Sequence, residues 1–135
     1  MSEKTPAEIA QQWLDDSAST ATNHQFTEHF NLISKKVRIT GEKGFDTVGY
    51  NDWARQSEEE FKDKVLQSVS YKGFKLLATN ERQIMFKTVE LIIANTGSRK
   101  AHGLEILLEL EEDGIWRVTQ ERILSDDESR HDGLM

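Results

Sequence analysis

The 135-residue chain contains no cysteine, which excludes disulfide bonds, thiolate-ligated metals and cysteine nucleophiles. It also has no apolar run approaching the roughly 20 residues that a helix needs to cross a bilayer. The first residues, Met1-Ser2-Glu3-Lys4-Thr5, lead into a polar helix and not into the apolar core of a signal peptide. These absences predict a cytoplasmic protein.

Basic residues are in the minority. The 24 acidic and 17 basic residues give a net charge of −7, which disfavours binding to phosphate backbones or anionic lipid surfaces. We therefore expect neither nucleic acid nor a membrane as a partner. The chain also lacks a Gly-rich phosphate loop, a nucleophile elbow and a Ser-His-Asp pattern, so no motif names a reaction.

Two amphipathic helices are predicted at the start of the chain. The capping box Thr5-Pro6-Ala7-Glu8 carries proline at the first helical position, so the first helix begins at Pro6. Apolar residues recur at helical spacing up to Ala21 and, after a polar break, again over residues 26–33. The second, shorter helix is expected to end before Ser34.

The remaining pattern predicts a single α+β domain, residues 1–135, with its core at about 6–125. A short strand (35–40) and an irregular loop precede a third helix over residues 51–63. Four antiparallel strands then form a meander over residues 68–79, 82–95, 103–111 and 115–124. Residues 126–135 are polar and without periodicity, and we expect a frayed tail there.

The last two strands form a β-hairpin whose register can be read from the residues. A three-residue loop, Glu112-Asp113-Gly114, gives one consistently apolar face, whereas a two-residue loop mixes apolar and charged positions. On that face it pairs Leu110 with Trp116, Leu108 with Val118, Ile106 with Gln120 and Leu104 with Arg122. We expect this face to cover the core, since exposing its large apolar groups would forgo about 10 kcal/mol.

The opposite face of the hairpin is then charged. It pairs Glu109 with Arg117, and it sets Glu105 against Glu121, which should repel each other. In the strand before the hairpin, one set of alternating positions is more apolar than the other and contains Met85, Val89, Leu91 and Ile93. Glu90 and Thr88 are therefore expected to point outward as well.

The order of these elements over residues 6–125 resembles the nuclear transport factor 2-like superfamily. The run Asp113-Gly114-Ile115-Trp116-Arg117-Val118 looks like the closing strand of its SnoaL-like and ketosteroid-isomerase-like branches. The resemblance implies a cone-shaped curved antiparallel sheet wrapped around the N-terminal helices, with a pocket at the open end. Its members include isomerases, dehydratases, cyclases and non-enzymatic binders.

In steroid-isomerase-like members, an aspartate near the end of the first strand shuttles the proton and a tyrosine in the first helix donates to the oxyanion. Here residues 37–41 contain no carboxylate, and the first-helix aromatic residue is Trp13. The indole of Trp13 can donate a hydrogen bond but cannot shuttle a proton at neutral pH. The isomerase mechanism of those members is therefore not carried over.

We expect the cone to bind a small apolar or amphipathic molecule between the first helix and the sheet. The predicted ligand-binding residues are Trp13, Phe26, Phe30, Leu108, Trp116, Val118, Gln120 and Arg122. Gln120 and Arg122 are the polar pair, suited to orienting a carboxylate or carbonyl. The alternative is that the strand has left the core by Gln120 and that Arg122 pairs with a nearby acid.

Two other functions remain open. The first is a cofactor-free isomerase, cyclase or dehydratase, with Glu90 or His29 as the acid–base group and Arg122 or Trp13 stabilising negative charge. The second is a homodimerisation module that pairs through the outer sheet face, where Leu107 and Ile123 lie among charges. No metal or other cofactor is predicted, because the histidines lack the spacing of convergent ligands.

Overall fold

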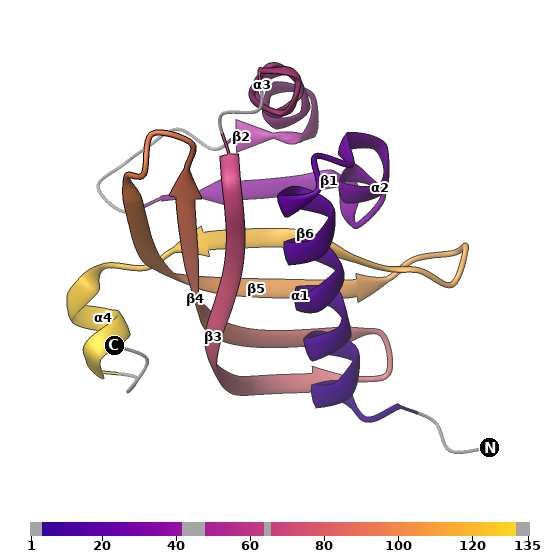
Figure 1. Ribbon diagram of the computed structural model, residues 1–135. Coiled ribbons are helices and arrows are strands. Elements are labelled where there is room, and N and C mark those ends of the chain that lie inside the picture. Colours follow the sequence, from indigo (N-terminus) through magenta and orange to yellow (C-terminus); the bar gives the residue numbers. More distant parts are fainter. Residues whose placement is uncertain (1–3, 42–47, 64–65, 132–135) are drawn as a thin grey trace.

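The computed structural model of the chain describes residues 4–41, 48–63 and 66–131 (Figure 1). Its helices are α1 (Pro6–Thr22), α2 (Phe26–Phe30), α3 (Tyr50–Lys62) and α4 (Asp126–His131). Its strands are β1 (Ile33–Thr40), β2 (Val48–Gly49), β3 (Leu66–Asn80), β4 (Gln83–Ala94), β5 (Arg99–Leu110) and β6 (Trp116–Ile123). Most of the predicted loop after Thr40 and the last residues of the predicted tail lie outside the described residues.

α1 begins where the capping box predicts. The Thr5 hydroxyl accepts from the Glu8 N–H at 3.2 Å, and the Glu8 carboxylate accepts from the Thr5 N–H at 3.2 Å. Because Pro6 has no N–H, this helix start leaves three N–H groups open, and the two bonds satisfy two of them. Figure 1 shows α1 lying across the sheet, toward which it turns its buried residues Ala10, Trp13, Leu14, Ser17 and Ala21.

The strands form one six-stranded sheet in the order β2-β1-β6-β5-β4-β3. β3 to β6 pair antiparallel in chain order, which confirms the predicted meander. β1 pairs parallel with β6, so the sheet is mixed and not wholly antiparallel. β3 bends along its length (Figure 1), and its register with β4 shifts around Gly73, whose φ is +75°. Because bulges of this kind curve a sheet, they produce the predicted α+β cone around α1.

The hairpin follows the predicted register only over its first three pairs. Leu110 lies opposite Trp116, Glu109 opposite Arg117 and Leu108 opposite Val118, around a loop in which Gly114 has a φ of +82°. A β-bulge then leaves Thr119 without a partner, so that Leu107 faces Gln120, Ile106 faces Glu121 and Glu105 faces Arg122. Beyond the bulge every side chain of β6 lies on the face opposite to the predicted one.

The bulge has an electrostatic reason. The unbulged register sets Glu105 against Glu121, whereas the observed register pairs Glu105 with Arg122 at 3.0 Å. The predicted inward positions of Gln120 and Arg122 are therefore wrong, and so is the outward position of Glu121. The alternative, in which Arg122 pairs with a nearby acid, is correct.

The predicted face of β4 is also wrong. Ile84 and Phe86 are fully buried on the inner face, and Thr88 and Glu90 share that parity. Lys87 and Val89 are buried on the outer face, where the Lys87 Nζ atom reaches the Glu128 carboxylate of α4 at 3.1 Å. Because both faces of β4 are covered, the face with more apolar residues is not the face that packs against the core.

The chain end forms α4 and is not a frayed tail over residues 126–131. The Ser125 hydroxyl accepts from the Glu128 N–H at 3.1 Å, as a helix cap does. The Glu128 carboxylate also contacts Arg122 at 2.9 Å, and Arg122 in turn contacts Glu105. The ion pairs fix α4 on the outer face and occupy Arg122.

Candidate functional site

A cavity of about 150 Å³ lies between α1, α2, α3 and the inner face of the sheet. Among its wall residues only Glu60 of α3 is classed as exposed, so Glu60 marks its rim. The wall residues are Trp13, Ser17, Ala21, His29, Leu32, Ile33, Trp53, Ser57, Glu60, Val69, Tyr71, Glu90, Ile92 and Glu121. Two acids, a tyrosine and a histidine thus meet inside the cone.

Neighbouring strands place three of the polar groups in one row. Tyr71 lies directly opposite Glu90 across β3 and β4, and His102 lies opposite Glu90 across β4 and β5. The Tyr71 hydroxyl donates to Glu90 Oε2 at 3.0 Å, and His102 Nε2 contacts Glu90 Oε1 at 3.0 Å. Since a tyrosine hydroxyl has one proton, the Ser17 hydroxyl at 3.1 Å donates to the Tyr71 oxygen. The result is a hydrogen-bonded chain from α1 to β5.

His102 completes this chain but is not fully satisfied. Its Nδ1 atom is buried without a hydrogen-bond partner among the described residues. If Nε2 carries the proton, that proton is donated to Glu90 and Nδ1 is left as an unpaired acceptor. Glu90 then accepts at both oxygens, which orients its carboxylate in the cavity wall.

Glu121 is the second acid of the cavity, and it is 9% exposed. No hydrogen bond joins its side chain to a residue of the described ranges. Burial, and then the nearby charge of Glu90, raise the pKa of Glu121 to about 8. At neutral pH the Glu121 side chain is therefore a protonated acid in the same cavity wall as Glu90.

Besides Glu121, two titratable groups inside the cavity, His29 and Tyr71, are neutral at pH 7. His29 lies 2.9 Å from the Thr20 hydroxyl, and burial lowers the pKa of its ring to about 4, an effect that Glu90 partly opposes. Burial, followed by the charges of Glu90 and Glu121, raises the pKa of the Tyr71 hydroxyl well above its usual range. No wall residue of the described chain carries a positive charge.

The structure places the sequence-predicted residues in different regions. Trp13, His29 and Glu90 line the cavity. Phe30 lies behind it, with its ring edge-on to Trp53 at 5.7 Å and tilted against Phe26 at 4.8 Å. Leu108 and Val118 are buried in the core outside the wall, Trp116 lines a separate shallow hollow, and Gln120 and Arg122 face outward.

Sequence reasoning missed Ser17, Tyr71, His102 and Glu121. One signal for Glu121 was present, because the predicted register brought Glu105 and Glu121 together as like charges. A bulge within residues 119–121 removes that repulsion and turns one of the two acids inward. Ser17, Tyr71 and His102 offered no comparable signal, since each is an ordinary residue in its own element.

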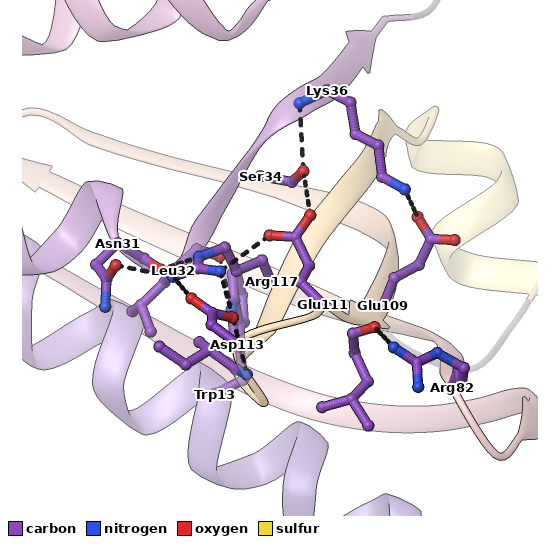
Figure 2. Close-up of polar contacts among 12 residues, drawn as sticks. Trp13, Asn31, Leu32, Ser34, Lys36, Arg82, Glu109, Glu111, Asp113 and Arg117 are labelled. Carbon is purple, nitrogen blue, oxygen red and sulfur yellow. Dashed lines mark hydrogen bonds and ion pairs between the residues drawn. The ribbon is translucent and has the colours of Figure 1, made fainter.

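A larger groove on the outer side of the sheet is less suited to a site, because most of its charged side chains already have partners (Figure 2). Arg117 contacts Glu111 at 3.0 Å and Asp113 at 2.9 Å, and its Nε atom donates to the Asn31 carbonyl at 2.8 Å. Lys36 contacts Glu109 at 3.4 Å. These bonds tie the hairpin to the start of β1, so we assign the groove a structural role.

The described ranges hold neither a cluster of metal ligands nor a helix that could cross a membrane. No three His, Asp or Glu side chains there are placed to hold a metal ion. No helix there is long and apolar enough to span a bilayer.

The fold and cavity define a class of protein: an α+β cone with polar groups at its inner end. The chain shares this architecture with solved structures of nuclear transport factor 2-like (NTF2-like) proteins, which confirms the predicted fold. A likeness of this kind establishes the fold alone, because one fold can host many unrelated functions.

Three solved structures illustrate the similarity. An NTF2-like protein of unknown function from Shewanella oneidensis MR-1 has a TM-score of 0.75 and 11% identity, covering 88% of this chain and 98% of its own. An NTF2-like protein from Cytophaga hutchinsonii ATCC 33406 has a TM-score of 0.72 and 9% identity, covering 90% and 99%. One from Novosphingobium aromaticivorans, described as having a cystatin-like fold, has a TM-score of 0.71 and 10% identity, covering 96% and 88%. No protein-family model matches the sequence, and no curated protein matches it.

Proposed function

We propose that the cavity binds a small molecule and that Glu90 and Glu121 exchange protons with it, as in a cofactor-free isomerase, cyclase or dehydratase. The observation that carries this proposal is the presence of both acids in one cavity, with Glu121 buried and without a hydrogen-bond partner among the described residues. Two acids whose surroundings favour opposite protonation states are suited to act as base and acid. The SnoaL-like resemblance is consistent with this type of reaction.

Each side chain has a defined part in the proposed reaction. Glu90 takes a proton from the ligand, held in place by Tyr71 and His102. The electron pair left behind shifts through the ligand, and Glu121 supplies a proton at its other end. The two acids have then exchanged protonation states, and proton transfer with solvent resets them. In steroid-isomerase-like members the acid–base group comes from the first strand, whereas here both acids come from the later strands β4 and β6.

A binding domain without catalysis is the alternative, and it uses the same cavity. It is favoured by the aromatic part of the wall, where Trp13 and Trp53 offer apolar surface to a ligand. Proton exchange separates the two functions, since a pure binder leaves the C–H bonds of its ligand intact.

The test is solvent deuterium incorporation into a panel of small carbon acids, followed by proton NMR in D₂O. We expect the wild type to exchange at least one member of the panel and Glu90→Gln to lower that rate by about 100-fold or more. Glu112→Gln, in the exposed hairpin loop, is the matched control and keeps the wild-type rate. Equal rates in the wild type and in the Glu90→Gln, Glu121→Gln double variant would contradict catalysis.

We further propose that the chain is cytoplasmic and forms a homodimer through the outer sheet face. Leu107 supports the dimer, because it lies on that face directly between Met85 and Gln120. Ile123 is 37% exposed, but the bulge places it opposite Leu104, so its part in the interface is not expected.

A further inference from the structure

We propose that the ligand of the interior cavity carries a small alkylammonium group. This inference rests on the proposed function only in using the same cavity. It concerns the class of ligand and not the reaction.

The charges of the wall exclude anions and favour cations. Glu90 and Glu121 lie inside the cavity and Glu60 lies at its rim, while no wall residue of the described chain is positive at neutral pH. Glu90 is 16% exposed at its side chain, so water screens its charge poorly. A carboxylate or phosphate ligand would meet the negative charge of Glu90 and no cation, whereas an ammonium group would supply the missing counter-charge.

The aromatic residues of the wall point to the same class. Trp13 donates its indole N–H to the Leu32 carbonyl at 3.1 Å, so that donor is unavailable to a ligand and the ring is what remains (Figure 2). Trp53 and Tyr71 add two more rings. Aromatic faces beside a carboxylate are the usual surroundings of bound alkylammonium groups.

The size of the cavity limits the ligand further. Its volume of about 150 Å³ is well below that of sites for drug-sized molecules, which begin at about 300 Å³. We therefore expect a compact head group such as a trimethylammonium or a short primary amine.

Binding of a cation is coupled to the proton on Glu121. The titratable groups around Glu121 are Tyr71 on β3, Glu90 on β4, His102 on β5, His29 on α2 and Glu60 on α3, whereas α1 and β1 contribute none to the wall. Burial, and then the negative charge of Glu90, keeps Glu121 protonated. A bound cation offsets the charge of Glu90 and therefore favours release of the Glu121 proton. The affinity for a permanent cation should then rise with pH from 6 to 9.

The test compares choline with 3,3-dimethylbutan-1-ol, its uncharged isostere, by isothermal titration calorimetry on the full chain. We expect choline to bind at least tenfold more tightly. We also expect it to release protons at pH 7, so that the observed binding enthalpy changes linearly with the ionisation enthalpy of the buffer. Glu90→Gln should abolish the preference for choline, and Glu121→Gln should abolish the proton release while the exposed-loop control Glu112→Gln changes neither.

The outcomes distinguish this inference from the proposed function. Equal affinity for the two compounds in the folded wild type would overturn the alkylammonium class and leave the cavity as a ligand site. Absence of choline binding at pH 9 would also overturn it, while deuterium exchange into neutral carbon acids would still support catalysis. If Glu90→Gln fails to fold by circular dichroism, proton release in Glu121→Gln decides the matter.

Discussion

At the scale of single residues, the protein places a carboxylate and a protonated carboxyl group in the wall of one cavity. Glu90 has hydrogen-bond donors at both carboxylate oxygens, whereas Glu121 has none among the described residues and is held protonated by burial and by Glu90. His29 is kept neutral by the same burial. The shifted pKa values of Glu121 and His29 make folding sensitive to pH, and the two directions differ.

The stability of the protein should fall as the pH rises from about 6.5 to about 8. The pKa of Glu121 is raised from 4.5 to about 8, so above pH 4.5 the unfolded chain has lost a proton that the folded chain keeps, and stability falls until about pH 8. The pKa of His29 is lowered from 6.5 to about 4, so its effect is opposite and is confined to pH 4 to 6.5. The two effects offset each other below pH 6.5, and only that of Glu121 remains above it.

Urea unfolding at half-unit pH steps measures this slope. Each unit of pH in the window should lower the free energy of unfolding by up to about 1.4 kcal/mol in the wild type, and Glu121→Gln should remove the fall. Glu112→Gln, in the exposed loop, serves as the control. A slope that survives in Glu121→Gln would assign the pH dependence to another group.

At the scale of elements, the bulge at Thr119 decides which β6 side chains enter the cone. It turns Glu121 inward opposite Ile106 and sends Arg122 outward to Glu105 and to Glu128 of α4. One inserted residue therefore sets both faces of the strand.

Deletion of Thr119 should be tolerated better than deletion of a residue within a continuous ladder. Without Thr119, Gln120 directly follows Val118 and the observed pairing of residues 120–123 is kept, so only the local bend is lost. Deletion of Met85 is the comparison, because it lies in an unbroken β4–β5 register and its loss reverses the faces of part of β4.

Thermal unfolding and carboxyl infrared spectra test this expectation. The variant lacking Thr119 should fold and keep a protonated carboxyl band at pH 7, which Glu121→Gln lacks. The variant lacking Met85 should fail to fold cooperatively. Equal damage in the two deletions would show that the bulge is needed for more than register.

At the scale of the whole molecule, the two faces of the sheet serve different purposes. The inner face carries the cavity, while the outer face carries the ion pairs that dock α4 and, beside them, Leu107 between Met85 and Gln120. An apolar residue among charges on an open sheet face is the feature that motivates the homodimer.

Leu107→Lys tests the dimer. If two copies pair through this face, the substitution places a like charge against its symmetry mate and should convert a dimer to a monomer at micromolar concentration, as measured by light scattering. Gln120→Lys, at the neighbouring position of β6, should weaken the dimer less because its side chain is already polar. A wild-type monomer at the same concentration would remove the proposal.

The sequence by itself determined the features that depend on neighbouring residues. The capping box starts α1, the Asp-Gly turn sets the first pairs of the hairpin, and the order of helices and strands specifies the cone. It also singled out Glu90 and His29, although it turned Glu90 the wrong way. These features follow from local hydrogen bonding and from periodicity, which a single chain displays openly.

Only the tertiary structure decided which side chains meet inside the cone. The sequence did not identify the inner face of β4, because the outer face is also covered. There α4, which was predicted to be a tail, packs on the strand through the ion pair of Glu128 with Lys87. The inner position of Glu121 depended on a bulge whose benefit, the pairing of Glu105 with Arg122, comes from another strand. Both are long-range effects, because the free energy that fixes a strand's faces comes from what packs against them.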